Sequence, residues 1–591
     1  MGVSDPARGR EKVRFQPDAR PPAALAFGLG LQLAVLTIPG IMLITTVVMR
    51  AAGESEAYLY WAVSATVVIS GAATVLQAFR IGRFGTGHVL VMGSSSASIA
   101  VCIAALVEGG PEMLATLVLV SALVPLAVSG RLPLLRRIMT PTVSGIVVML
   151  IPVTVMPVVF ELLGRAPAGS PGAAAPLCAL VTVLSTLGIA LGSKGALRLW
   201  APLIGVAAGS VAAGFFGIYD LDSIAEAPWI GFPANEWPGL DLDFGPGFWA
   251  LLPGFLFIAL IGALRTMSSC VAVQGVSWRE RRAVDFRAVQ GAVTTDGTAS
   301  LLAGFAGTVP STAYTVSVPV IELTGAAART VGVATGAVFV ALVLLPKTFA
   351  LILAVPNPVL AGYLAVLLAI LFVAGMRAVV NDGLDYRKTV VVGVAFWVGV
   401  GCQYGMIFPE QVAEFAGGLF RNGMTAGGLV AIVMTGLLEL TESRPSRLEA
   451  DFGMSALPEL REFLRSFASR AGWDTVMADR LDAVGEETQL SLVPAAEDGD
   501  GKEGRSGRRR LRLSAKRGEG GAVLEFVVAP RGENIEDRLA ALGAGTGEGA
   551  IERDVSLRLL RHLSSSVRHR QYHDTDIVTV NVEAPSRSGR T

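Results

Sequence analysis

Charged residues are scarce in this chain. Asp, Glu, Lys and Arg make up only 16% of its 591 residues, whereas 52% are hydrophobic. A mean hydropathy of +0.58 excludes an ordinary water-soluble globular protein. The formal net charge is zero, so the chain also lacks the basic surface of a nucleic-acid-binding protein. We therefore expect a lipid bilayer to replace water around much of the chain.

Cysteine and histidine are equally rare, with four of each. The cysteines lie inside apolar stretches without metal-ligand spacing, so we interpret them as packing residues; they are Cys102, Cys178, Cys270 and Cys402. The sequence predicts no enzyme active site, metal or cofactor. His88 is the only histidine before the C-terminal region, and we expect an interfacial position or a proton-relay role for it.

Long apolar blocks are what the chain does contain. The apolar blocks are 13 to 27 residues long, and about 20 residues of helix cross the hydrocarbon layer. They cover residues 23–49, 61–78, 113–128, 142–163, 177–191, 199–216, 248–270, 331–353, 359–373, 390–402 and 426–440. Two further blocks, 93–107 and 298–322, are interrupted by polar residues. Counting these as pairs of half-spans gives roughly 14 crossings.

The distribution of charge predicts the orientation. Basic residues recur after every second block, whereas the loop 217–247 carries only acidic charges. By the positive-inside rule, this predicts a multi-pass protein of the inner (plasma) membrane with both termini in the cytoplasm. Residues 1–22 carry basic side chains among Pro and Gly without a short apolar core, so we expect a disordered tail instead of a signal peptide.

An internal repeat divides the apolar region, 23–441, into two halves. Residues 141–145 open a long apolar block in the first half, as 358–362 do in the second. Short polar runs also correspond. An odd number of spans per half makes the repeats inverted. We thus predict an all-α polytopic membrane protein with 14 transmembrane segments in two inverted seven-span repeats, about 23–218 and 248–441, with segments 3 and 10 broken.

The two polar runs, 93–98 and 307–312, are the strongest candidates for a binding site. Unwound backbone and small hydroxyls facing lipid cost on the order of several kcal/mol each, so the runs must line a cavity or pack against protein. If the breaks meet at mid-depth, the helices that restart after them direct free amides to one point. Such a point suits carbonyl oxygens or an anion. Close packing between helices is the alternative for any single serine.

Three of the charged residues in or beside the apolar blocks are candidates for a function. Arg265 is the only charge in block 248–270, and a charge at this depth indicates function, although snorkelling toward the block's end would also explain it. Asp296 and Glu322 lie near the start and end of the second broken segment. We expect them to be caps or ion-pair partners at the cytoplasmic rim, or to take part in coupling or gating.

The order of these features resembles the uracil/xanthine permeases of the nucleobase-ascorbate transporter family. The resemblance covers roughly residues 20–440, and its motifs are specific for the family but not for the substrate. It is carried by 296–297, 302–307, 310–312, 320–325, 346–347 and 355–362, with 92–95 in the first half and Gln32 in the first span.

The resemblance implies a core domain and a gate domain that move by alternating access, with proton coupling as an option. It implies a secondary transporter for a nucleobase such as xanthine, uracil or urate, and we also expect a homodimer. Together with the polar runs, it gives the substrate-binding set Ser94, Ser96, Ser98, Arg265, Ser269, Tyr314, Thr315, Val316 and Ser317. Candidates for coupling or gating are Gln32, His88, Asp296 and Glu322.

Two positions depart from the family's pattern. Relatives usually carry Glu where Arg265 stands, and Glu or Gln followed by Asn where Val316 and Ser317 stand. Arginine removes the obvious coupling acid and adds a fixed positive charge, which favours an anionic substrate such as urate. A small-anion transporter similar to the sulfate/anion exchangers stays open, as does a non-transporting sensor that signals through its C-terminal domain.

Residues 442–591 are predicted to form a cytoplasmic α+β domain. We expect helices at 457–471, 476–493 and 554–567, strands at 511–515, 522–528 and 576–582, and a loop at 497–510. The domain weakly resembles the histidine-kinase-like ATPase fold of anti-sigma-factor kinases. Ser491 and Pro530 stand where that fold requires Asn and Asp, so we expect no kinase activity. An unrelated module for dimer contacts or regulation is the alternative.

Overall fold

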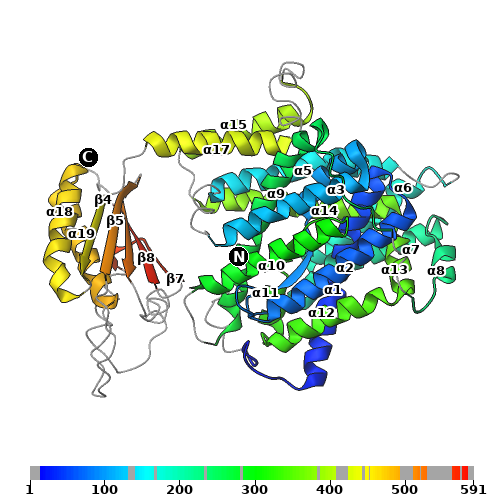
Figure 1. The fold of residues 1–591 in the computed structure, drawn as a ribbon, viewed down its shortest axis with the longest axis horizontal. Helices are drawn as coiled ribbons and strands as arrows, with labels where there is room; N and C mark the ends of the chain where they lie inside the picture. Colours follow the sequence, from blue (N-terminus) through cyan, green and yellow to red (C-terminus); the bar gives the residue numbers. More distant parts are fainter. Residues whose placement is uncertain are drawn as a thin grey trace. The chain divides into compact units, whose positions relative to one another are not determined.

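The protein forms two compact units, each described here by itself (Figure 1). One comprises Met1–Arg279 and Ala288–Glu439, and the other Glu280–Arg287 and Leu440–Thr591. A computed structural model describes residues 13–130, 140–164, 170–231, 236–279, 284–382, 386–407, 423–441, 446–451, 453–492, 510–518, 521–528, 562–572 and 575–583.

Helices dominate the first unit. The first half contains α1 (Ala23–Ala52), α2 (Glu56–Ala78), α3 (Ile99–Ser129), α5 (Pro141–Gly164), α6 (Ala174–Gly192), α7 (Ala201–Phe215), the short α8 (Leu221–Glu226) and two 3-10 turns, η1 (Ser96–Ser98) and η2 (Gly195–Trp200). The second half contains α9 (Pro246–Ser277), α10 (Phe286–Phe305), α11 (Ser317–Thr324), α12 (Arg329–Val343), α13 (Pro346–Leu353), α14 (Asn357–Asn381), α15 (Tyr386–Gln403) and α17 (Gly423–Thr441). Within the described residues, eight helices are long and apolar enough to cross a membrane, or nine if α12 and α13 form one bent span.

Two of the apolar stretches are not continuous helices. Gly109 and Gly110 have non-helical backbone angles within α3, directly before Pro111. The predicted block 331–353 is divided into α12 and α13, whose axes differ by 86°. Pro346 begins α13, where its missing N–H costs no helical hydrogen bond. Proline and glycine therefore set both interruptions.

The helices pack into two groups. In one group α1 and α2 pack on α12, and α3 packs on α9. In the other, α14 packs on α5, α6 and α7, and α15 packs on α5. Small residues permit the closest approach: a Cβ added to Gly145 of α5 would lie 2.8 Å from the Gly375 carbonyl oxygen of α14. Pairs of this kind hold membrane helices together without a hydrophobic driving force.

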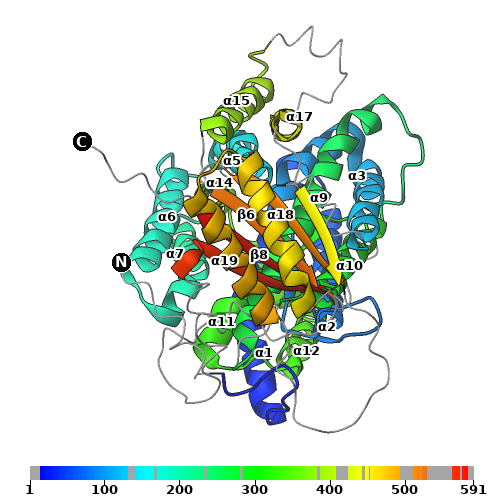
Figure 2. The same ribbon diagram turned by 90° about the vertical axis from the view of Figure 1, so that its left-hand side faces the viewer.

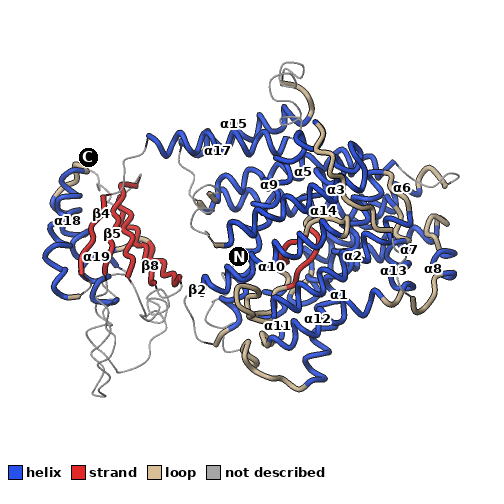
Figure 3. The backbone as a smooth tube through the Cα atoms, in the orientation of Figure 1, coloured by secondary structure: helices blue, strands red, loops and turns tan. Residues whose placement is uncertain are grey.

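A two-stranded antiparallel sheet lies among the helices of the first group (Figure 3). It pairs β1 (Val91–Ser94) with β3 (Ser311–Tyr314), with Ser94 opposite Ser311 and Val91 opposite Tyr314. These strands overlap the two polar runs at 93–94 and 311–312, so the runs do interrupt helices and do meet. The sequence analysis did not predict that they pair as strands, which satisfies their unwound backbone through the ladder.

Residues 13–20 differ from the disordered tail that the sequence predicts, whereas 1–12 lie outside the described residues. The Arg14 and Phe15 amides both donate to the Gly325 carbonyl, at 2.8 and 3.0 Å. Asp18 forms an ion pair with Arg329, 2.7 Å between Oδ1 and Nη2. This segment is therefore fastened to the turn between α11 and α12.

The second unit is an α+β layer structure. Its sheet has the order β2-β7-β8-β6-β5-β4, from Val284–Asp285, Ser566–Tyr572, Thr575–Glu583, Gly521–Val528, Arg510–Gly518 and Ser446–Asp451. Helices α18 (Leu457–Arg470) and α19 (Thr475–Leu492) lie over one face, as Figure 2 shows. Leu464, Leu481 and Phe526 are among the fully buried side chains between these layers.

Most predicted elements of this unit are confirmed, with one error. The expected helices at 457–471 and 476–493 are α18 and α19, and the three expected strands are β5, β6 and β8. The predicted helix 554–567 is wrong at its end, because Ser566 begins strand β7; residues 554–561 lie outside the described part. The sequence analysis missed β4, whose charged residues alternate with partly buried ones at the sheet edge.

Candidate functional site

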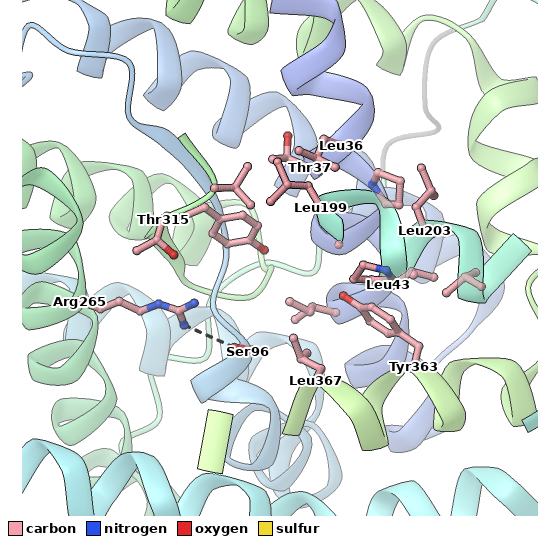
Figure 4. Close-up of a pocket in the computed structure, with 17 residues that line it drawn as sticks. Leu36, Thr37, Leu43, Ser96, Leu199, Leu203, Arg265, Thr315, Tyr363 and Leu367 are labelled. Carbon is pink, nitrogen blue, oxygen red and sulfur yellow. Dashed lines mark hydrogen bonds between the residues drawn. The ribbon is translucent and has the colours of Figure 1, made fainter. Parts of the chain in front are cut away.

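A cavity of about 220 Å³ opens where the two interrupted segments meet (Figure 4). Five parts of the first unit line it besides Ser96 of η1: α1, the η2–α7 segment, α9, the end of β3 and α14. Its lining comprises Leu36, Thr37, Pro39, Gly40, Leu43, Ile44, Ser96, Leu199, Pro202, Leu203, Val206, Arg265, Tyr314, Thr315, Val316, Tyr363 and Leu367. The cavity thus lies between the two helix groups.

Hydrogen bonds between β1 and β3 give one wall of the cavity its shape. The Tyr314 hydroxyl donates to the Ser94 carbonyl at 2.9 Å, and the Ser95 amide donates to the Pro310 carbonyl at 3.0 Å. The Ser94 hydroxyl donates in turn to the Ile41 carbonyl of α1 at 2.8 Å. Backbone from both halves of the chain is therefore joined to α1 at this point.

Arg265 brings the positive charge to the cavity. Its Nη1 lies 3.5 Å from the Ser96 hydroxyl oxygen, the long hydrogen bond drawn in Figure 4. Tyr363 enters from α14 on the opposite side of the cavity. The guanidinium therefore lines the cavity between the two helix groups, at the position expected of a functional charge. Among the described lining residues, Arg265 is the only charged one.

Asp296 corrects the sequence analysis. It is not a cap at the cytoplasmic rim but an interior residue of α10 that is 2% exposed. Its carboxylate hydrogen-bonds Thr266, the neighbour of Arg265, and interacts electrostatically with Arg265 itself. It borders a second cavity of about 20 Å³, which has room for about one water. The prediction is wrong because α10 begins at Phe286, ten residues before Asp296, so that Asp296 lies inside the helix.

The structure brings together five of the nine predicted substrate-binding residues. Ser96, Arg265, Tyr314, Thr315 and Val316 all line the cavity. The cluster joins η1, α9 and β3 with the residues directly after it, as the resemblance implied. These five residues offer a ligand three hydroxyl groups, one guanidinium and one valine side chain. The described lining of the cavity contains no carboxylate.

The other four predicted residues are buried supports that do not line the cavity. Ser94 is described above, and the Ser98 hydroxyl donates to the Ser95 carbonyl at 2.8 Å. Ser317 begins α11 and accepts a hydrogen bond from the Val91 amide at 3.3 Å. Ser269 is fully buried on α9, one turn beyond Arg265. Ser94, Ser98 and Ser317 thus hold the interrupted backbone in place, whereas the Ser269 hydroxyl has no hydrogen-bond partner among the described residues.

The remaining coupling or gating candidates lie outside the cavity lining. Gln32 is half-buried on α1, one turn before Leu36. His88 is buried, with Nδ1 2.9 Å from the Thr86 hydroxyl and its ring against the edge of Trp278. Glu322 is exposed on α11. Only Asp296 among the four is close to Arg265.

Sequence reasoning missed the far wall of the cavity. Tyr363 and Leu367 come from α14, and Leu199 and Leu203 come from the η2–α7 segment. One signal was available, because Tyr363 directly follows the repeated motif 358–362 and is a hydroxyl-bearing residue in an otherwise apolar span. The leucines carry no such signal, since any membrane helix contains them.

The chemistry of the cavity suits a small molecule that is polar on part of its surface. Thr37, Ser96, Thr315 and the two tyrosines supply hydroxyls, and apolar side chains cover the rest of the surface. The start of α11 adds one backbone amide, that of Ser317, because Val318 donates to the Thr315 carbonyl and Pro319 has no N–H. The described residues contain no group of three or more side chains that could hold a metal ion.

Comparison with known proteins gives a consistent result. The xanthine/uracil permease model, described as a permease family, matches residues 25–407. A putative purine permease of Clostridium perfringens is 28% identical over 69% of this chain and 89% of its own. The Escherichia coli xanthine permease XanQ is 28% identical over 74% and 96%, and the Bacillus subtilis uric acid permease PucK is 26% identical over 69% and 94%.

Proposed function

The chain belongs to the xanthine/uracil permease family, and we propose that it carries an oxidised purine such as xanthine or urate across the plasma membrane through the cavity around Arg265. The single observation behind this proposal is the cavity itself, which lies where two interrupted segments meet between two groups of helices. Small relative movements of the two groups would open it to one side of the membrane or the other.

We propose 14 segments in two inverted repeats, with a core group and a gate group. The antiparallel pairing of β1 with β3 supports inversion, and the non-helical Gly109 and Gly110 divide α3 into two segments. In this arrangement α1, α2, α3 and α9 to α12 form the core, whereas α5, α6, α7, α14, α15 and α17 form the gate. Both termini are cytoplasmic, and two copies form the homodimer.

Uptake into proteoliposomes tests the proposal. We expect saturable uptake of radiolabelled xanthine or urate, and at least about tenfold weaker affinity in Ser96→Ala combined with Thr315→Ala, since two hydroxyl contacts are lost. Ser185→Ala is the matched control, because Ser185 is on α6 and its hydroxyl donates within the helix. If the protein binds bases saturably but transports none of them, the result supports the non-transporting sensor instead.

A small-anion exchanger is the second candidate, and the positive charge of Arg265 is the observation that favours it. Counterflow of sulfate or chloride in the same proteoliposomes separates the two functions. An exchanger moves these ions at rates that Arg265→Ala abolishes. A nucleobase permease leaves them unmoved while its base uptake saturates.

Coupling to protons is tested with an imposed pH gradient. Stimulation of uptake by an inside-alkaline gradient, and its loss in Asp296→Asn, would support Asp296 as the coupling group. Equal uptake with and without the gradient contradicts proton coupling. Asp222→Asn is the matched control, because that side chain is exposed on α8.

A further inference from the structure

The charges around the cavity indicate the ionisation state of its substrate. Arg265 contributes the only charge among the described residues of the lining. Its hydrogen bond to Ser96 is long at 3.5 Å, and a guanidinium has five N–H donors. Within the described part of the chain, no carboxylate lies at salt-bridge distance from it. Most of its donors are thus available to a ligand.

The negative charge of Asp296 lies near Arg265 but outside the large cavity. Its side chain is on α10, and a Cβ at Gly262 would lie 3.9 Å from its Oδ2. It borders the small second cavity, whereas Arg265 lines the large one. Asp296 therefore offsets part of the cost of burying the guanidinium without supplying an acceptor at the ligand's position.

The backbone adds to the positive character of this wall. Val316, at the N-cap of the eight-residue helix α11, lines the cavity. Of the first three residues of α11, only Ser317 has a backbone amide without a described acceptor, because Val318 donates to the Thr315 carbonyl and Pro319 has no N–H. The positive end of the helix dipole is directed to the same place. The titratable groups near Arg265 are Asp296 of α10, Tyr314 of β3 and Tyr363 of α14, and none of them is a carboxylate within the cavity lining.

We infer that the cavity selects the deprotonated monoanion of an oxidised purine, and that Arg265 is its counter-ion and sets this specificity. The inference rests on the proposed function and adds the charge state of the substrate. Losing an N–H proton converts a donor on the purine into an acceptor and leaves a negative charge. Both changes match the donor-rich, positively charged wall and would be disfavoured beside a carboxylate.

Equilibrium binding to the purified full chain tests the inference. Affinities are measured for urate, a purine that ionises below neutral pH, and for uracil, a base that is uncharged there, between pH 5 and about 8. We expect urate to bind at least about tenfold more tightly at neutral pH. Its apparent affinity should rise with pH in proportion to the anionic fraction and then level off, while that for uracil stays flat.

Arginine variants complete the test. Arg265→Gln should weaken urate binding about 10- to 100-fold with little effect on uracil, whereas Arg265→Lys should retain part of the preference. Arg198→Gln is the control, since that exposed arginine immediately precedes the lining residue Leu199. If Arg265→Gln unfolds because Asp296 loses its partner, the double variant with Asp296→Asn removes both charges, and it should show the same loss.

The outcomes separate the inference from the function on which it rests. Saturable binding with equal affinity for charged and uncharged bases, or an unchanged preference in both Arg265→Gln and the double variant, overturns the inference and leaves the permease standing. Absence of saturable binding and uptake for every base overturns the proposed function and this inference with it.

Discussion

The Tyr314 hydroxyl on β3 donates a 2.9 Å hydrogen bond to the backbone carbonyl of Ser94 on β1. The two residues are 220 positions apart and come from the two halves of the chain. Tyr314 also lines the cavity, so one side chain both closes the strand pair and contacts the ligand position. Changes at this junction should therefore affect transport and stability together.

Gly93 is the most sensitive position of the strand pair. A Cβ there would lie 2.7 Å from Cζ of Tyr314 and 2.8 Å from Cγ1 of Ile41. The added methyl group would have to displace the Tyr314 ring or α1, and both help to form the cavity wall. Gly93→Ala should therefore reduce base uptake at least about tenfold and lower the melting temperature. Gly188→Ala on α6 is the control, because its Cβ would meet nothing within 4 Å. Equal uptake by the two variants would show that the wall is more compliant than its packing indicates.

Tyr314→Phe removes one hydrogen bond and leaves the ring in place. The expected loss is about 1 kcal/mol of stability, the usual net contribution of a neutral hydrogen bond. Ligand affinity should fall severalfold, because the Ser94 carbonyl loses its donor and the wall loosens. Tyr363→Phe provides the comparison, because Tyr363 lines the cavity but its hydroxyl has no described hydrogen bond to the strand pair. This variant should lower ligand affinity without lowering stability. Thermal unfolding and ligand titration distinguish the two effects.

Thr66 and Thr308 join α2 to the segment before β3. Their hydroxyl oxygens are 2.6 Å apart, and both residues are almost fully buried. Thr308→Val should cost about 1 kcal/mol, because it removes hydrogen bonds without changing the shape. The double variant with Thr66→Val should cost less than the sum of the two single changes, which a double-mutant cycle on the melting temperature measures. Strict additivity would mean that the two hydroxyls do not interact in the folded protein.

Arg329 makes two contacts of unequal value. Its ion pair with Asp18 is exposed, with 38% and 65% of the two side chains accessible, so Asp18→Asn should change stability by at most about 1 kcal/mol. Its Nε also donates to the Gly87 carbonyl at 2.9 Å. Arg329→Gln should therefore be the more harmful change, by about 1 to 2 kcal/mol. If thermal unfolding shows a larger loss of stability for Asp18→Asn than for Arg329→Gln, the ion pair to the N-terminal segment contributes more than the hydrogen bond to Gly87.

The sequence predicts the near wall of the cavity because its chemistry is unusual for a membrane. A serine run, a Pro-Ser-Thr run and one arginine are costly in lipid, so Ser96, Arg265 and Thr315 are visible without a structure. The far wall is not visible. Leu199, Leu203 and Leu367 are indistinguishable from lipid-facing leucines, because the residue type does not say which neighbour covers it.

The fold shows the same limit. Periodicity identifies α18 and α19, whose apolar faces repeat at helical spacing. It fails for Asp296, where the depth of the residue depends on how α10 packs beside α9. It also fails for β4, because an edge strand with alternating charges resembles a loop in composition. Tertiary packing decided these features, and local sequence does not encode it.

The pairing of β1 with β3 is made of main-chain hydrogen bonds, and these persist when side chains change rotamer. In the transport cycle that we propose, this wall therefore keeps its form, while the wall carrying Tyr363 and Leu203 moves relative to it. A molecule that touches the constant wall alone has equal affinity for both conformations and cannot shift their populations. An inhibitor that traps one conformation must also reach Tyr363.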